Sequence, residues 1–125
     1  MVIVSPPQEL RERTKKFAIR VIRLFQALPK SSEAQILGKQ LLRCGTAVAA
    51  NYRAACRGRS RAEFISRMGV VAEEADESIL WLELLEETGI LSAKRLSEIS
   101  NEAKELTAIF STSLKTAKDN VKDDT

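Results

Sequence analysis

Apolar residues recur along the chain at alternating spacings of four and three, the pattern of one face of an α-helix. Four stretches carry such a seam, and short turns with proline or glycine separate them. The seams predict helices over about residues 6–28, 33–55, 61–88 and 93–117, followed by a frayed polar tail over 118–125. Because the turns are short, consecutive helices should run antiparallel. We therefore expect an all-α fold, an up-down-up-down four-helix bundle, in one domain covering residues 1–125.

The residues of the four seams are expected to form the core. The first two helices contribute Leu10, Thr14, Phe17, Val21, Leu24 and Leu28, then Leu37, Leu41, Cys44, Val48, Asn51 and Ala55. The last two contribute Phe64, Met68, Val71, Ala75, Ser78, Leu82 and Leu85, then Leu96, Ile99, Ala103, Leu106, Phe110, Ser113 and Ala117. Asn51 is polar, and a buried amide without a partner costs ~1–3 kcal/mol. It either fixes the register between helices or contacts a ligand.

Serines and one glycine mark the predicted helix ends. Ser5 with Gln8, Ser32 with Gln35, and Ser60 with Glu63 have the spacing of a capping box. Ser92 is placed to open the last helix. Gly89 is expected to end the third helix in the left-handed conformation, which glycine adopts without strain.

Composition narrows the classes of protein. No apolar run reaches the ~20 residues of a membrane span, and the N-terminus does not resemble a signal peptide. The chain has two cysteines and no histidine, so neither a disulfide framework nor a zinc site is expected. Cytoplasmic localisation follows as the default expectation.

Charge is unevenly distributed. Residues 1–67 hold 14 Lys and Arg against 4 Asp and Glu, whereas residues 68–125 hold 6 against 13. Such a chain can bind polyanions with its basic part. It can equally pair its two parts with each other, within one subunit or between subunits.

The third helix has more apolar surface than one stripe, because residues 79–85 are apolar at all but one position. Glycines inside predicted helices cost ~1 kcal/mol each unless they allow a close approach. Small residues on the second and third helices could make such a contact, either within the chain or between copies. We expect a homo-oligomer, with an interface that includes Gly45, Ala49, Gly69, Ala72 and Trp81.

Acidic residues of the third helix are the candidates for catalysis. Glu73, Asp76 and Glu77 share a face, but they lie off the seam and no histidine accompanies them. Cys44 falls on a seam, as a small core residue would, and Cys56 lacks a histidine to activate it. We therefore expect no catalytic residue, no metal site and no cofactor, and a protein that is not an enzyme.

Arginine is the one strong chemical signal. Every basic residue between Arg43 and Arg67 is an arginine, and arginine suits bidentate contacts to phosphate or carboxylate. The expected nucleic-acid-binding residues are Arg53, Arg57, Arg59, Arg61 and, as a stacking platform, Tyr52. In the alternative, these arginines pair with carboxylates of the bundle. An antiparallel hairpin would place Arg43 level with Glu74 and Asp76.

Several of these residues together resemble a known family. The set is Gln40, Leu41, Arg43, Val48, Asn51, Arg59, Ser60, Glu63 and Phe64, followed by residues 74–85 and Gly89-Ile90. It resembles the 23S rRNA intervening-sequence proteins, which are related to the accessory variability proteins of diversity-generating retroelements. The resemblance spans about residues 10–110. Many members read Asn-Ile-Ala-Glu-Gly where this chain reads Asn51-Tyr52-Arg53-Ala54-Ala55, so a role for that glutamate does not carry over.

The resemblance implies a four-helix bundle that forms a homopentamer with a basic surface and binds nucleic acid. Two interpretations remain open. The first is a non-enzymatic oligomer that binds RNA or DNA through the arginine-rich end between the second and third helices. The second is a structural or protein-interaction scaffold whose arginines pair with carboxylates within or between subunits, or with a protein partner such as a reverse transcriptase.

Overall fold

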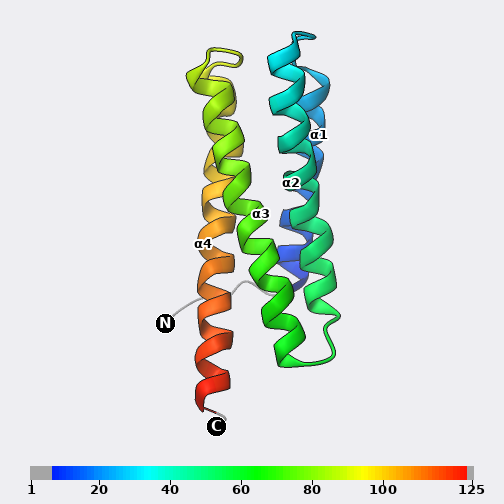
Figure 1. Cartoon of the computed structure of the whole chain (residues 1–125), viewed down its shortest axis with the longest axis vertical. Helices are drawn as coiled ribbons and strands as arrows, with labels where there is room; N and C mark the ends of the chain where they lie inside the picture. The colour runs from blue at the N-terminus through cyan, green and yellow to red at the C-terminus, as the bar shows by residue number, and fades with distance from the viewer. Residues whose placement is uncertain (1–6, 124–125) are drawn as a thin grey trace.

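The computed structural model describes residues 7–123, and these form four helices joined by short turns (Figure 1). The helices are α1 (Pro7–Gln26), α2 (Ser32–Cys56), α3 (Arg61–Glu87) and α4 (Ala93–Asp123). The described residues contain no β-strand. The predicted all-α class and antiparallel bundle are confirmed. No helix within residues 7–123 is long and apolar enough to cross a membrane.

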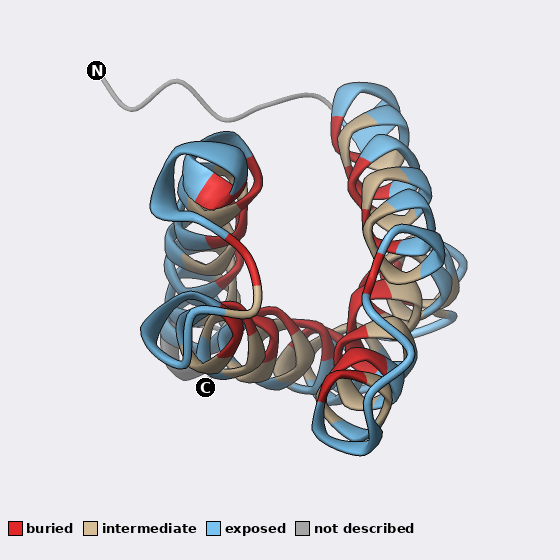
Figure 2. Ribbon diagram, turned by 90° about the horizontal axis from the view of Figure 1, so that it is seen from above, coloured by how far each residue is buried: buried red, intermediate tan, exposed pale blue. Residues whose placement is uncertain are grey.

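Each helix packs mainly on its neighbour in the chain. Extensive contacts join α1 to α2, α2 to α3 and α3 to α4, whereas α1 and α4 meet at few positions. Seen from above, the buried residues of all four helices face the inside of this arrangement (Figure 2). The α2–α3 turn lies at the same end of the bundle as the start of α1 and the C-terminal half of α4 (Figure 1).

The helix ends differ from the prediction by more than one residue at two places. α1 ends at Gln26, because Ala27 and Leu28 close a tighter final turn before Pro29. α4 continues to Asp123, past the predicted end at Ala117, so the predicted frayed tail is helical as far as the structure describes it. Neither proline nor glycine interrupts residues 93–123, and extending an existing helix costs little.

Capping side chains fix the turn between α2 and α3. The Ser60 hydroxyl accepts a hydrogen bond from the Glu63 amide at 3.1 Å, as predicted. The Glu63 carboxylate reaches the Arg59 amide at 3.3 Å instead of that of Ser60. Ser92 caps α4 by accepting from the Arg95 amide at 3.2 Å.

The other predicted caps have mixed outcomes. α2 is capped by Ser31, which accepts from Ala34 N at 3.4 Å, and not by Ser32. Ser31 has the extended backbone that a cap requires, whereas Ser32 is already helical. Gly89 has the predicted positive φ, 75°. The predicted Ser5 cap lies outside the described residues.

Most residues of the predicted seams form the core, but the seam shifts near the end of α2, and five other seam residues are only half-buried: Leu24, Leu37, Phe64, Ser113 and Ala117. The large buried side chains include Phe17, Leu41, Val48, Met68, Val71, Leu82, Leu96, Leu106 and Phe110. Near the end of α2, Tyr52 is buried, while Asn51 is half-buried and donates to the Ala47 carbonyl at 2.9 Å. Asn51 therefore does not lie on the seam as predicted. A straight helix drifts by ~20° per heptad, which moves the buried face from Asn51 to Tyr52.

Small residues of α2 face α1. A Cβ on Gly45 would lie 2.8 Å from Val21 Cγ2, so glycine is what allows this close approach. The predicted contact of Gly45 with the third helix or with another subunit is wrong, because Gly45 is buried against α1. Gly69 differs, since a Cβ there would meet no atom within 4 Å. Ala49, Ala72 and Trp81 are half-buried in the single chain.

Candidate nucleic-acid interface

The arginine-rich end is built by the tight turn between α2 and α3. Arg57 closes α2, and its amide donates a hydrogen bond to the Ala54 carbonyl at 3.2 Å. Gly58 follows with its amide 3.0 Å from the Ala55 carbonyl. A Cβ at Gly58 would lie 3.1 Å from that oxygen, so a residue with a side chain fits poorly here. The turn leaves Arg53, Arg57, Arg59 and Arg61 exposed at one end of the bundle.

Two groups of arginines in the chain differ in their partners. Arg13, Arg20 and Arg43 form ion pairs with glutamates. Among the described residues, no ion pair joins Arg53, Arg57 or Arg59 to a carboxylate. The second group thus carries positive charge that the bundle itself does not neutralise.

Two of these arginines line a recess that also includes the start of α1. Arg53, in the last turn of α2, and Arg57, at its C-cap, lie opposite Gln8, Arg11 and Glu12 of α1. The recess has a volume of about 260 Å³. The sequence interpretation missed Arg11. The signal was available, because an antiparallel first pair of helices brings the start of α1 to the end of α2.

Arg61 lies on another side of the turn. It borders a hollow of about 440 Å³ between the start of α3 and the end of α4, with Phe64, Thr112, Ser113, Thr116, Ala117 and Asn120. A third hollow, of about 380 Å³, has Arg11 in common with the recess and Phe64 and Ser113 in common with the Arg61 hollow. The predicted arginines therefore sit around the end of the bundle and do not converge on one point.

Tyr52 cannot serve as the predicted stacking platform. Its side chain is buried, and its ring lies 5.5 Å from that of Phe110. Burial, followed by a hydrogen bond with the Cys56 thiol, raises the pKa of Tyr52. A base cannot reach this ring in the folded chain. The shift of the α2 seam from Asn51 to Tyr52 accounts for the failed prediction.

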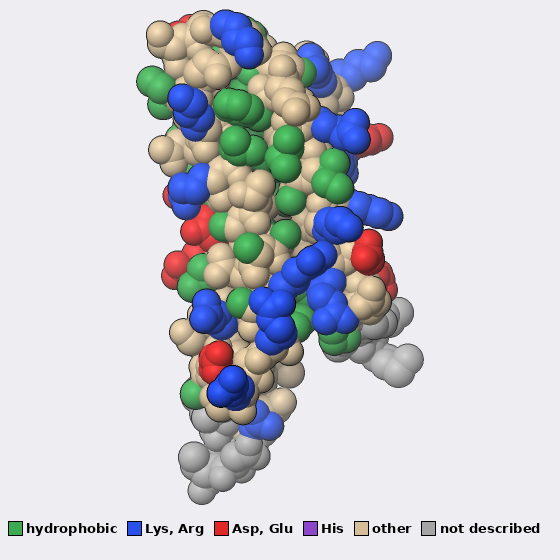
Figure 3. Space-filling view, turned by 90° about the vertical axis from the view of Figure 1, so that its right-hand side faces the viewer, with side chains coloured by type: hydrophobic (Ala, Val, Ile, Leu, Met, Phe, Trp, Pro, Cys, Tyr) green, Lys and Arg blue, Asp and Glu red, His purple; other side chains and the backbone are tan. Residues whose placement is uncertain are grey.

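Lys and Arg side chains are spread over the whole face of the molecule seen in Figure 3, with one close group just below its middle, and acidic side chains are fewer on this face. Patches of apolar side chains lie between them (Figure 3). Exposed large apolar residues on the first two helices are Ile19, Ile22 and Ile36, with Val70 and Leu80 on α3. The single chain therefore offers both basic and apolar surface.

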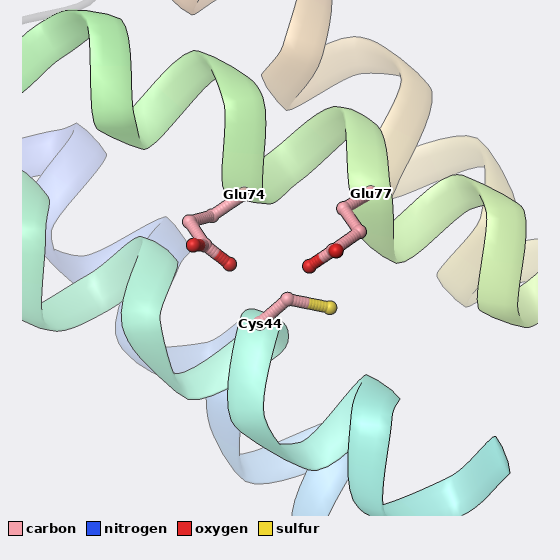
Figure 4. A group of neighbouring side chains, drawn as sticks. All are labelled: Cys44, Glu74 and Glu77. Carbon is pink, nitrogen blue, oxygen red and sulfur yellow. The ribbon is translucent and has the colours of Figure 1, made fainter.

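A separate cluster joins Cys44 of α2 to Glu74 and Glu77 of α3, whose side chains point toward one another (Figure 4). Their potential ligand atoms lie within 4.8 Å of one another. Arg43 pairs with both carboxylates, and its Nη1 lies 3.3 Å from Glu74 Oε2. The predicted pairing of Arg43 with Glu74 is confirmed, but its second partner is Glu77, not Asp76. Glu77 lies one turn from Glu74 on the same face.

The chemistry of this cluster favours an ion pair over a metal site. Burial is the main cause that raises the pKa of Cys44, and a protonated thiol is a poor metal ligand. The Ser78 hydroxyl lies 3.2 Å from Cys44 Sγ and donates to the Glu74 carbonyl at 2.9 Å. A cation placed here would also meet the Arg43 guanidinium. The cluster links α2 to α3.

Most of the chain matches a known protein family. The sequence profile of the 23S rRNA-intervening sequence protein family matches residues 8–112. The chain belongs to this family. The matched range includes the arginine-rich turn and all of the arginines that line the recess.

A crystal structure supports the same assignment. The protein is from Bacteroides thetaiotaomicron VPI-5482, belongs to the S23 ribosomal protein family and is described as having unknown function. It is 30% identical to this chain, with a TM-score of 0.81, covering 87% of this chain and 97% of its own. None of the curated proteins compared with the chain matches it.

Proposed function

We propose that this member of the 23S rRNA-intervening sequence protein family is a non-enzymatic, oligomeric, cytoplasmic protein that binds RNA or DNA through its arginine-rich α2–α3 end. The observation that carries this proposal is the contrast between two groups of arginines. Arg43 is neutralised by Glu74 and Glu77, whereas Arg53 and Arg57 have no carboxylate partner among the described residues.

Phosphate is the anion that this arrangement suits best. Guanidinium groups bind phosphate in a bidentate manner, and a phosphodiester backbone presents phosphates in series to arginines spread over one end of a protein. Contacts of this kind position a protein on the nucleic acid and do not read its sequence. The proposal therefore includes no base preference.

The test removes the arginines and measures the salt dependence of binding. Replacing Arg53, Arg57 and Arg59 together with alanine should weaken binding to an RNA or DNA oligonucleotide. Each arginine that neutralises a phosphate adds roughly 0.7–0.9 to the slope of log affinity against log salt, so the slope should fall by about 2–3. The matched control replaces Lys94, Arg95 and Lys104, which are exposed residues of α4 away from the turn.

The control variant loses the same number of positive charges as the arginine variant. If binding depends on the α2–α3 end, the salt slope of the control variant should change less than that of the arginine variant. A slope that is equal in the wild type and the arginine variant would contradict the proposal. Circular dichroism of both variants shows whether the helices remain folded.

Exposed apolar surface favours a second candidate, a scaffold that binds proteins. Ile36 is 63% exposed and Leu80 48% exposed in the single chain. Such residues suit contacts with other copies or with a partner such as a reverse transcriptase. If the arginines pair with carboxylates of other copies, the triple arginine variant would lose assembly, and any binding of nucleic acid would keep its salt slope.

A further inference from the structure

The recess between the start of α1 and the end of α2 gathers three arginines from two helices. Arg53 lies in the last turn of α2 and Arg57 caps the end of this helix, and both line the recess. Arg11 lies on the facing side of α1, with Gln8 one turn before it. The three guanidinium groups therefore border one space, although Arg11 is more than forty positions from the others in sequence.

The charges around this space are unbalanced. Glu12 is the one carboxylate among the lining residues, against three guanidinium groups. None of these three arginines forms an ion pair with any residue that the structure describes. Positive groups brought together in this way repel one another unless an anion lies between them.

A hydrogen bond with Gln8 orients the Arg11 side chain without using all of its N–H donors. Its Nη2 donates to Gln8 Oε1 at 2.6 Å, within the same helix. A guanidinium has five N–H donors, so this bond leaves others to contact an anion. The Gln8 amide accepts through its oxygen and keeps its own N–H₂ group as a further donor.

We propose that this recess binds one phosphate group, held by Arg11, Arg53 and Arg57 with Gln8 as an additional donor. The proposal rests on the proposed function and extends the nucleic-acid interface from the α2–α3 turn onto α1. The volume of about 260 Å³ is below that of pockets for drug-sized ligands, so a phosphate group fits it better than a whole nucleotide. The ligand is a backbone phosphate of the bound nucleic acid.

The decisive variant is Arg11→Ala, because Arg11 lies outside the turn that defines the proposed function. With labelled oligouridine as the probe, its affinity should fall about ten-fold or more, as for loss of a hydrogen bond between charged groups. The salt slope should fall by roughly 0.7–0.9, one phosphate contact. Lys15→Ala is the matched control, because Lys15 is exposed one turn further along α1 and carries the same charge. It should change the slope less.

A second variant keeps the proposal testable if Arg11→Ala disturbs the fold. Glu12→Gln removes the opposing carboxylate and no donor, so it should tighten binding of oligouridine. Unchanged or weaker binding by Glu12→Gln would overturn the proposal. Arg11→Ala that folds and keeps the wild-type slope would overturn it as well.

Inorganic phosphate and pyrophosphate distinguish a free anion from a nucleic-acid backbone. A ligand that binds the folded state raises the melting temperature by mass action. If the recess takes a backbone phosphate, either anion should compete with oligouridine only weakly, and oligouridine should produce the larger rise. Tight binding of free phosphate with no binding of oligouridine would overturn the backbone assignment.

Failure of this inference is separable from failure of the proposed function. If Arg11→Ala has no effect while the triple variant of Arg53, Arg57 and Arg59 lowers the slope, the recess is not a phosphate site and the turn still binds nucleic acid. If neither variant changes the slope, both proposals fail.

Discussion

The phenol ring of Tyr52 on α2 packs against the ring of Phe110 on α4, with centroids 5.5 Å apart and planes inclined by 36°. This contact joins two helices that are not consecutive in the chain. It also places the one tyrosine of the protein in the core, so the proposed binding of nucleic acid at the α2–α3 end would depend on charge and not on stacking by this ring.

Burial of Tyr52 predicts a loss of stability at alkaline pH. Its pKa is raised in the folded state, whereas the unfolded chain has the ordinary value of about 10. Stability is therefore full below pH ~10 and falls as the pH rises above it, because only the unfolded state releases the proton readily. Urea unfolding across this range should show a free energy of unfolding that decreases with pH, and Tyr52→Phe should reduce that decrease.

Tyrosinate absorbance tests the same point directly, because Tyr52 is the one tyrosine. The folded protein should resist formation of tyrosinate until it unfolds. A native spectrum that titrates near pH 10 with the helices intact would show that Tyr52 is accessible. In the urea unfolding experiment, Cys44→Ala serves as a control. The raised pKa of Cys44 adds its own loss of stability at a lower pH than that of Tyr52.

The alternating spacing of apolar residues was enough to place Leu41, Val48 and Leu82 in the core, because those positions depend only on helical period. It placed Asn51 where Tyr52 lies, because a seam of strict heptads diverges from a straight helix toward its end. A sequence pattern therefore identifies the apolar face of a helix more reliably at the centre of the helix than at its ends.

Pairing across helices was predictable only in part. The antiparallel hairpin placed Arg43 level with Glu74, and this pair exists. The approach of Arg11 to Arg53 depends on how far α1 overlaps the end of α2. Periodicity within each helix leaves that register free, and the buried Gly45–Val21 contact settles it through packing.

Gly45→Leu should destabilise the fold. Its side chain would have to enter space that Val21 occupies, and overpacking of this kind costs about 1–3 kcal/mol. Chemical denaturation should show a lower midpoint. An unchanged midpoint would mean that α1 moves away from α2 at little cost.

Gly69→Ala is expected to do the opposite in a single chain. A Cβ at Gly69 meets no atom within 4 Å, and alanine in a helix interior is favoured over glycine by about 0.5–1 kcal/mol. The denaturation midpoint should rise. If instead the variant loses stability or assembled mass, another copy must approach Gly69 closely.

The ion pair between Arg13 and Glu102 should hold α1 to α4, which meet at few positions. Arg13 donates from both Nε and Nη2, at 3.2 and 2.6 Å, and both side chains are partly buried. A double-mutant cycle with Arg13→Ala and Glu102→Ala should give a coupling of about 1–2 kcal/mol, between the values for exposed pairs and for buried hydrogen bonds to charged groups. A coupling near zero would show that helix packing alone holds α1 and α4 together.

Assembly with other copies is predicted from the apolar residues that the single chain leaves exposed. Light scattering should give a mass well above the 13.9 kDa of one chain, and about five times that value for the expected homopentamer. Leu80→Glu should lower the assembled mass while the helices stay folded, because Leu80 is 48% exposed and a charge there disturbs only a surface that a partner covers. Ser97→Glu adds the same charge at an exposed site of α4 and should leave the mass unchanged.

A wild-type protein that remains a monomer at micromolar concentration would remove assembly from the proposed function. The salt-dependence experiments would then apply to a single bundle.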